Sequence, residues 1–221
     1  MSCLLPAVAL VVAATLASGC GSATVAELPP AAAPPPAPPA ADAPAGEVVP
    51  LEDWTGTVPA TPRPGTPVSL RDGRLTVAVL PRERAVEIRD GQTGRRLSRV
   101  SAGVGPTQVA CRDTGPCYVL DTRGDGLLVL VVSDDGRDAR ISRRVYLRGG
   151  PSAVALDEER ARIWVTAPGR NELSELPAHG RPRVLRRLPT VRGPYAVAVD
   201  APTGAVLVTG RAAGLLQRVT P

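Results

Sequence analysis

Short apolar runs separated by turn residues recur along the chain, and one pattern returns almost unchanged. A Gly-Pro pair opens an apolar run at Gly105–Cys111, Gly150–Leu156 and Gly193–Val199, and a fainter copy ends at Val68–Leu70. The matching valines of the four copies lie 41, 45 and 43 residues apart. Repeats of roughly 40 to 50 residues built from short apolar runs are typical of β-propeller blades. The spacing therefore predicts an all-β propeller of about four blades.

Each repeat divides into four apolar runs, which the third repeat shows most clearly. Its runs cover residues 153–156, 162–166, 172–176 and 183–188, and the linkers between them are too short for helices. The inner runs are almost wholly apolar, as in buried strands, whereas the outer runs alternate, as in half-exposed strands. Each blade is therefore predicted to be a sheet of four antiparallel strands.

The last repeat contains only three such runs. Residues 54–58, just before the first repeat, have a suitable position and composition to supply the missing outermost strand from the N-terminal side. This exchange would pair the two ends of the chain and leave no open sheet edge there. A closed ring of four blades, a partial propeller and an assembly of two chains all stay open.

Three segments of the repeats resemble a known family. Residues 73–79 (Gly-Arg-Leu-Thr-Val-Ala-Val), 117–122 (Cys-Tyr-Val-Leu-Asp-Thr) and 161–166 (Ala-Arg-Ile-Trp-Val-Thr) are similar to YVTN-type bacterial propeller repeats, which are related to NHL repeats. The resemblance covers about residues 68–220. It implies the propeller fold but not one activity, because members of the family serve as scaffolds, binding modules and occasionally enzymes. Seven blades are usual in that family, and only four can be counted here.

The N-terminus has the pattern of an export signal. The apolar run Leu4–Leu16 is too short to span a membrane comfortably, and it is followed by Ala17-Ser18-Gly19-Cys20. Small residues before a cysteine resemble the lipobox of bacterial lipoproteins, which implies a signal peptide at residues 1–19 and a lipid (palmitate) anchor on Cys20. Ala17 stands where leucine is usual, and no basic residue precedes the apolar run. An ordinary secretory signal and an uncleaved anchor are the alternatives.

The segment that follows the predicted anchor is rich in Ala and Pro. Residues 20–50 lack the large apolar side chains that offset the entropy of ordering, and prolines favour extended chain. We expect residues 20–50 to be a disordered tether and residues 51–221 to be the propeller domain. The predicted location is the extracytoplasmic face of the cell membrane.

Export makes a disulfide reasonable for Cys111 and Cys117, which are the two cysteines outside the predicted signal peptide (Cys3) and the predicted anchor (Cys20). Cys111 and Cys117 flank a turn-rich stretch between two apolar runs, so they can face each other across a hairpin. A metal pair and a redox pair are the competing interpretations. The spacing is not C-x-x-C, and His179 is the only histidine, so the structural disulfide is favoured.

Composition and charge limit the classes of partner that the chain is expected to bind. The chain has no Phe, three Tyr and two Trp, so Val, Leu, Ile and Ala must build the core. All 26 basic residues are Arg and the net charge is +5, a balance that could suit nucleic acid, anionic lipid or acidic wall polymers. The arginines are interleaved with Asp and Glu along the chain, and no aromatic stacking platform accompanies them. We therefore expect an ordinary solvated surface and no nucleic-acid partner.

Candidate catalytic groups are few. His179 lies in a turn without a nearby nucleophile motif, and Asp121–Gly126 only partly matches a calcium loop, because Arg123 stands where a carboxylate belongs. We expect a tight turn there, and no metal site or cofactor.

The residues at the ends of the innermost strands are the candidate ligand contacts, because such residues can ring the mouth of a propeller channel. Asp157 and Asp200 end two of these strands, and satisfied turn carboxylates are the alternative interpretation of both. The candidates are Arg71, Thr107, Gln108, Arg112, Ser152, Asp157, Tyr195 and Asp200.

The sequence favours a membrane-anchored, non-catalytic binding or scaffold module over an enzyme. Its expected partner is a protein or a cell-envelope component, and an oligomer stays open. A metal-assisted hydrolase or lyase that uses acids at the channel mouth is the alternative.

Overall fold

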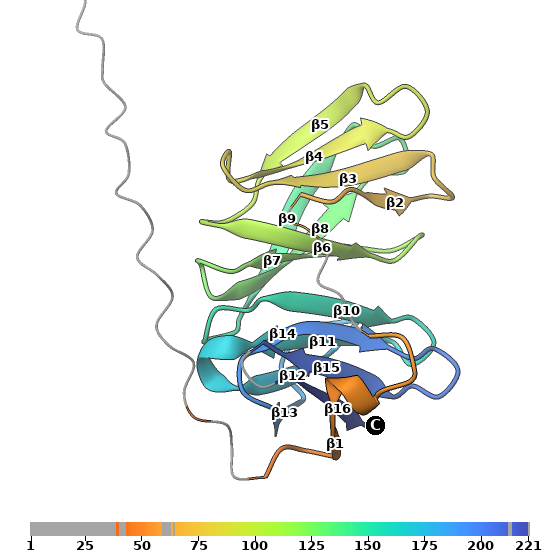
Figure 1. Ribbon diagram of the computed structural model, residues 1–221. Helices are drawn as coiled ribbons and strands as arrows, with labels where there is room; N and C mark the ends of the chain where they lie inside the picture. Colours follow the sequence, from red (N-terminus) through yellow and green to blue (C-terminus); the bar gives the residue numbers. More distant parts are fainter. Residues whose placement is uncertain (1–38, 40–42, 59–62, 64, 212–213, 221) are drawn as a thin grey trace, which may run out of the picture. The chain divides into compact units, whose positions relative to one another are not determined.

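Four antiparallel sheets of four strands each make up the domain (Figure 1). The computed structural model describes residues 39, 43–58, 63, 65–211 and 214–220. The predicted signal peptide and Cys20 lie outside the described residues. From the innermost strand outward, the blades are built as follows: blade 1 from β2 (Val68–Leu70), β3 (Leu75–Leu80), β4 (Ala85–Asp90) and β5 (Arg96–Ser101); blade 2 from β6 (Pro106–Cys111), β7 (Cys117–Asp121), β8 (Gly126–Val132) and β9 (Ala139–Tyr146); blade 3 from β10 (Ala153–Asp157), β11 (Arg162–Ala167), β12 (Glu172–Pro177) and β13 (Arg186–Pro189); blade 4 from β14 (Pro194–Val199), β15 (Val206–Gly210), β16 (Leu215–Val219) and β1 (Glu47–Pro50).

The predicted blades are confirmed, with the outermost strand of blade 4 coming from the N-terminal side. That strand is β1, which pairs with β16 so that Val49 lies opposite Leu216. The prediction that residues 54–58 form this strand is wrong. Leu51–Asp53 form a 3-10 turn (η1), and the Trp54 indole then donates to the Thr57 carbonyl, so this stretch turns instead of extending. β1 occupies the last four residues of the segment assigned to the tether.

Three apolar clusters hold neighbouring blades together. Blades 1 and 2 share Leu70, Ile88 and Leu130; blades 2 and 3 share Tyr118 and Ile163; blades 3 and 4 share a cluster that includes Trp164 and Val208. Aliphatic side chains dominate all three clusters, as the composition predicts. The sheets do not close into a ring, so the described part of the chain is a partial propeller.

The Gly-Pro motif marks the point where one blade is tied to the next. Asp125 and Asn171 lie at equivalent turns between the second and third strands and both adopt positive φ. The Asp125 carboxylate accepts the Gly150 N–H at 2.8 Å, and the Asn171 amide oxygen accepts the Gly193 N–H at 2.8 Å. The motif therefore repeats for a structural reason, because its glycine N–H is an anchoring donor.

Blade 1 cannot use this device, because Arg84 takes the equivalent place. Asp121 of blade 2 substitutes for it: this fully buried carboxylate accepts the N–H groups of Val104 and Gly105 at 3.0 and 2.7 Å, and also that of Gly124. Arg144 lies 3.1 Å away and balances its charge. The predicted tight turn after Asp121 is confirmed, since residues 122–125 form a turn.

The Cys111–Cys117 disulfide is also confirmed. The two residues face each other across the β6–β7 hairpin and lie at the edge of the cluster between blades 1 and 2. Nearby, the Tyr118 hydroxyl donates to the Ala178 carbonyl of blade 3 at 2.7 Å, and burial raises the pKa of this phenol. The disulfide therefore holds the inner hairpin of blade 2 together, and the Tyr118 hydrogen bond fastens blade 2 to blade 3.

Candidate ligand-binding surfaces

The strand ends define two faces of the propeller. The inner strands β2, β6 and β10 point the same way (Figure 1), so turns that follow them lie on one face and turns that precede them lie on the other. Hydrogen bonds between the turns of neighbouring blades join turns of the same face. Thr122 donates to Pro151 O of the next blade on one face, and Arg71 donates to Asp113 O of the next blade on the other.

The eight candidate residues divide between these two faces instead of ringing one mouth. The innermost strands β6, β10 and β14 contribute candidates at both of their ends, which lie a full strand length apart, and β2 contributes only at its C-terminal end. Thr107, Gln108, Ser152 and Tyr195 lie at the N-terminal ends, and Arg71, Arg112, Asp157 and Asp200 lie at the C-terminal ends.

The N-terminal candidates make contacts within the fold or are buried in it. The Thr107 hydroxyl is 2.7 Å from that of Thr122, and Ser152 Oγ donates to Pro194 O at 3.1 Å, so both hydroxyls belong to links between blades. Gln108 is only 7% exposed. Tyr195 is partly exposed, and Arg211 stacks on its ring at 5.4 Å. This group of residues mainly fastens one blade to the next.

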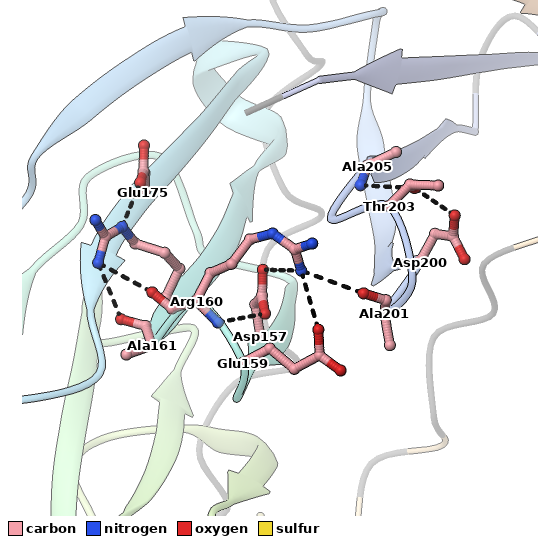
Figure 2. Close-up of polar contacts among 10 residues, drawn as sticks. Asp157, Glu159, Arg160, Ala161, Glu175, Asp200, Ala201, Thr203 and Ala205 are labelled. Carbon is pink, nitrogen blue, oxygen red and sulfur yellow. Dashed lines mark hydrogen bonds and ion pairs between the residues drawn. The ribbon is translucent and has the colours of Figure 1, made fainter.

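The two aspartates at the C-terminal ends stabilise turns. Asp157 is 3% exposed, accepts the Arg160 N–H at 3.0 Å and lies 3.6 Å from the Arg160 guanidinium (Figure 2). Arg160 also donates to Ala201 O of blade 4 at 3.2 Å. Asp200 accepts the hydroxyl of Thr203 within its own turn. Both carboxylates thus stabilise turns, and the buried Asp157 Oδ2, which accepts no hydrogen bond from the described residues, is the atom that forms the ion pair with Arg160.

The two arginines at the C-terminal ends also bridge blades. Arg71 donates to the carbonyls of Asp113 and Val132 and pairs with Asp134, while its side chain is only 10% exposed. Arg112 lies 2.9 Å from Nδ1 of His179, which is the chain's only histidine and comes from blade 3. Within the described residues, no group of three or more His, Cys, Asp or Glu side chains could hold a metal ion.

The two faces differ in charge, and this difference was hidden in the sequence. Successive turns alternate between the faces, so arginines and acids that are interleaved along the chain can separate in space. The turns on the face of Thr122 carry seven arginines and two acids, whereas those on the face of Arg71 carry eight of each. We call them the basic face and the mixed face. The basic-face turns are residues 81–84, 102–105, 122–125, 147–152, 168–171, 190–193 and 211–214, and the mixed-face turns are residues 71–74, 91–95, 112–116, 133–138, 158–161, 178–185 and 200–205.

The arginines of the basic face are also less paired. All seven are exposed, and among the described residues only one of them, Arg170, makes an ion pair, with Glu172 at 3.5 Å. The connection between β1 and β2 reaches the same face and adds Glu52, Asp53 and Arg63, so the excess of positive charge persists. The seven arginines are Arg82, Arg84, Arg123, Arg148, Arg170, Arg192 and Arg211.

A groove of about 320 Å³ opens at the rim of the basic face between blades 2 and 3. It is lined by Tyr146, Arg148, Arg170, Glu172 and Arg187. A second groove of similar size lies at the rim of the mixed face between blades 1 and 2, and it carries three arginines and three aspartates. The first groove therefore has an excess of two positive charges, while the second is balanced.

Comparisons with known proteins place the chain by fold. No family model matches it, and no curated protein matches it either. Among solved structures, it is similar to the β-propeller domain of Cps50 (Swd1) from Myceliophteria thermophila, with a TM-score of 0.62, 13% identity, and coverage of 70% of this chain and 50% of that chain. Virginiamycin B lyase from Staphylococcus aureus follows with a TM-score of 0.55, 14% identity, and coverage of 70% and 51%.

A chain of the mitotic checkpoint complex is similar as well, with a TM-score of 0.60, 10% identity, and coverage of 72% and 49%. The chain thus spans about half the length of these structures. At such low identity the similarity shows the β-propeller fold alone. The similar structures include an enzyme, virginiamycin B lyase, and a chain of a protein complex, so the similarity does not choose between the two classes of function.

Proposed function

We propose that the protein is a non-catalytic binding or scaffold propeller of the YVTN type, held by a lipid anchor on the outer side of the cell membrane. The observation that carries this proposal is the use of the mouth residues. Asp157, Asp200 and Arg71 are engaged in turn and interblade contacts. What remains accessible is a pair of charged turn faces, which suits recognition of a protein or an envelope component better than chemistry.

Retention of an envelope component tests the binding role. Full-length protein is immobilised in detergent and incubated with solubilised envelope, and bound material is then eluted with free protein. We expect a defined component to be retained and competed off. Equal retention by an immobilised protein of matched net charge would contradict the proposal.

Metal analysis with an activity screen tests the alternative of a metal-assisted hydrolase or lyase. We expect no turnover, and no stoichiometric divalent ion that is lost from Asp157→Ala or Asp200→Ala. The finding of both would replace the binding role with a catalytic one. Among the described residues, no helix has the length and apolar character needed to cross a membrane.

Labelled palmitate tests the anchor separately. We expect incorporation into the wild type and none into Cys20→Ala, since the thiol of Cys20 is the expected acceptor. Labelling that persists in Cys20→Ala would refute this anchor but leave the binding role standing.

A further inference from the structure

The groove on the basic face combines the chemistry and the shape of an anion site. Arg148 is exposed and makes no ion pair among the described residues. Arg170 and Arg187 both pair with Glu172, at 3.5 and 3.0 Å, and each uses its Nε atom. Glu172 thereby fixes two guanidinium groups at the groove while their terminal nitrogens stay available for a ligand. A planar guanidinium with two such donors matches the geometry of a phosphate group.

The walls of the groove are supported by neighbouring contacts. Arg144 stacks on the Tyr146 ring at 5.1 Å and is itself held by the buried carboxylate of Asp121. The Arg170 side chain lies over Gly149, where an added Cβ would come within 2.7 Å of Arg170 Cγ. Gly149 is therefore needed to let this arginine lie along the groove.

Positive charge continues from the groove across the basic face. Arg123, Arg192 and Arg211 project from turns of blades 2, 3 and 4 and make no ion pair among the described residues. A ligand with several negative groups along its length could therefore contact the groove and these turns together. A single small anion would use only the groove.

We propose that the basic face binds a flexible polymer that carries phosphate groups, with the groove of Arg148, Arg170 and Arg187 as its main contact. This inference rests on the proposed binding role and names the ligand class for it. A chain can enter a groove that a flat membrane surface cannot, so the hollow favours a polymer over lipid headgroups. A nucleic acid is not favoured, because single aromatic rings and no stacking platform accompany these arginines in the described part of the chain: Tyr146 lines the groove and Tyr195 lies under Arg211.

Polyphosphate binding to the full chain in detergent tests this proposal. The test variant is Arg148→Gln with Arg170→Gln, which leaves Arg187 paired with Glu172. The control is Arg181→Gln with Arg183→Gln, two exposed arginines of the mixed face, so both variants lose the same charge. We expect the test variant to bind at least about tenfold more weakly at 0.1 M salt, because each phosphate contact adds about one unit to the slope of log K against log salt concentration, which amounts to up to about tenfold in affinity at 0.1 M relative to 1 M. The control should change less than about twofold.

Several outcomes would overturn the inference. Equal weakening in the two variants would show attraction by net charge alone. Equal binding of polygalacturonate would show that phosphate is not what is recognised, and tighter binding of oligothymidylate would indicate a nucleic-acid surface. Binding only to vesicles that contain phosphatidylglycerol would indicate a membrane surface. If polyphosphate fails to bind but an envelope component is still retained, this inference falls and the binding role stands.

Discussion

The two faces of the propeller differ in how their arginines are used: among the described residues, three of the eight mixed-face arginines make ion pairs, against one of the seven on the basic face. On the mixed face, Arg71 and Arg160 reach across to carbonyls of the next blade and pair with nearby acids. On the basic face, exposed arginines such as Arg148 and Arg192 make no ion pair among the described residues. An arginine that pairs with acids and donates to carbonyls of a neighbouring turn, as Arg71 does, becomes part of the fold. An arginine without them stays available for a ligand.

The largest expected effect is loss of the disulfide that bounds a mixed-face turn. Replacing Cys111 and Cys117 together with Ala frees the turn whose Asp113 carbonyl accepts Arg71. The chain-entropy estimate for so short a loop is about 2 kcal/mol of stability. Urea unfolding with and without reductant should show this loss in the wild type only with reductant. Reductant should leave the double variant unchanged, and an equal response of both proteins would contradict the assignment.

Substituting one arginine on each face compares how much the two arginines contribute to stability. Arg71→Met removes a nearly buried guanidinium with two carbonyl acceptors, and we expect a loss of about 1.5 to 2 kcal/mol. Arg148→Met on the basic face should change stability by less than about 0.5 kcal/mol, as is usual for exposed side chains. Both are read from urea unfolding midpoints. Equal losses would mean that the faces do not differ in the role of their arginines.

Much of the fold could be predicted from the sequence, because packing and turn residues repeat with the blades. The strands, their order and the Cys111–Cys117 pair follow from local patterns. The closing strand does not, because residues 47–50 and 54–58 are both short and partly apolar. Pairing with β16 decides between them, and the contact that shows it, Leu51 N–H to Gly214 O, joins residues far apart in the chain.

The candidate surface is harder to predict, because its positive charge separates by face of the propeller and not along the chain. Arg82-Glu83-Arg84 suggests a balanced surface, yet Glu83 pairs with Arg99 on β5 at 2.7 Å. The two flanking arginines are then left without an acid among the described residues. Adding the charges of alternate turns separately would have revealed the basic face. No such signal marks Asp121, because its role depends on Arg84 occupying the equivalent position in blade 1.

The smallest expected effect extends the comparison to the flank of blade 1. Glu87 has a side chain only 6% exposed, and Arg89, Arg96 and Arg99 surround it at 2.7, 3.5 and 3.8 Å. Burial alone raises the pKa of this carboxyl, but the hydrogen bonds and charges of Arg89 and Arg96 outweigh burial and hold the pKa below its ordinary value. Here arginine pairing goes with burial, as on the mixed face.

The sign of the pH dependence follows from that lowered pKa. Ionised Glu87 stabilises the fold at pH values above the pKa of an unfolded Glu, about 4.3, and this contribution is lost as pH falls through the lower pKa of the folded state. Glu87→Gln should therefore flatten the pH dependence of the unfolding free energy between about pH 5 and pH 3. The change should be at most about 1 kcal/mol, because the arginines that pair with Glu87 are partly exposed. Glu83→Gln is the matched control, since Glu83 is half exposed and pairs with the same Arg99. A profile for Glu87→Gln as steep as that of the wild type would mean that the arginines around Glu87 are no better paired than those of the basic face.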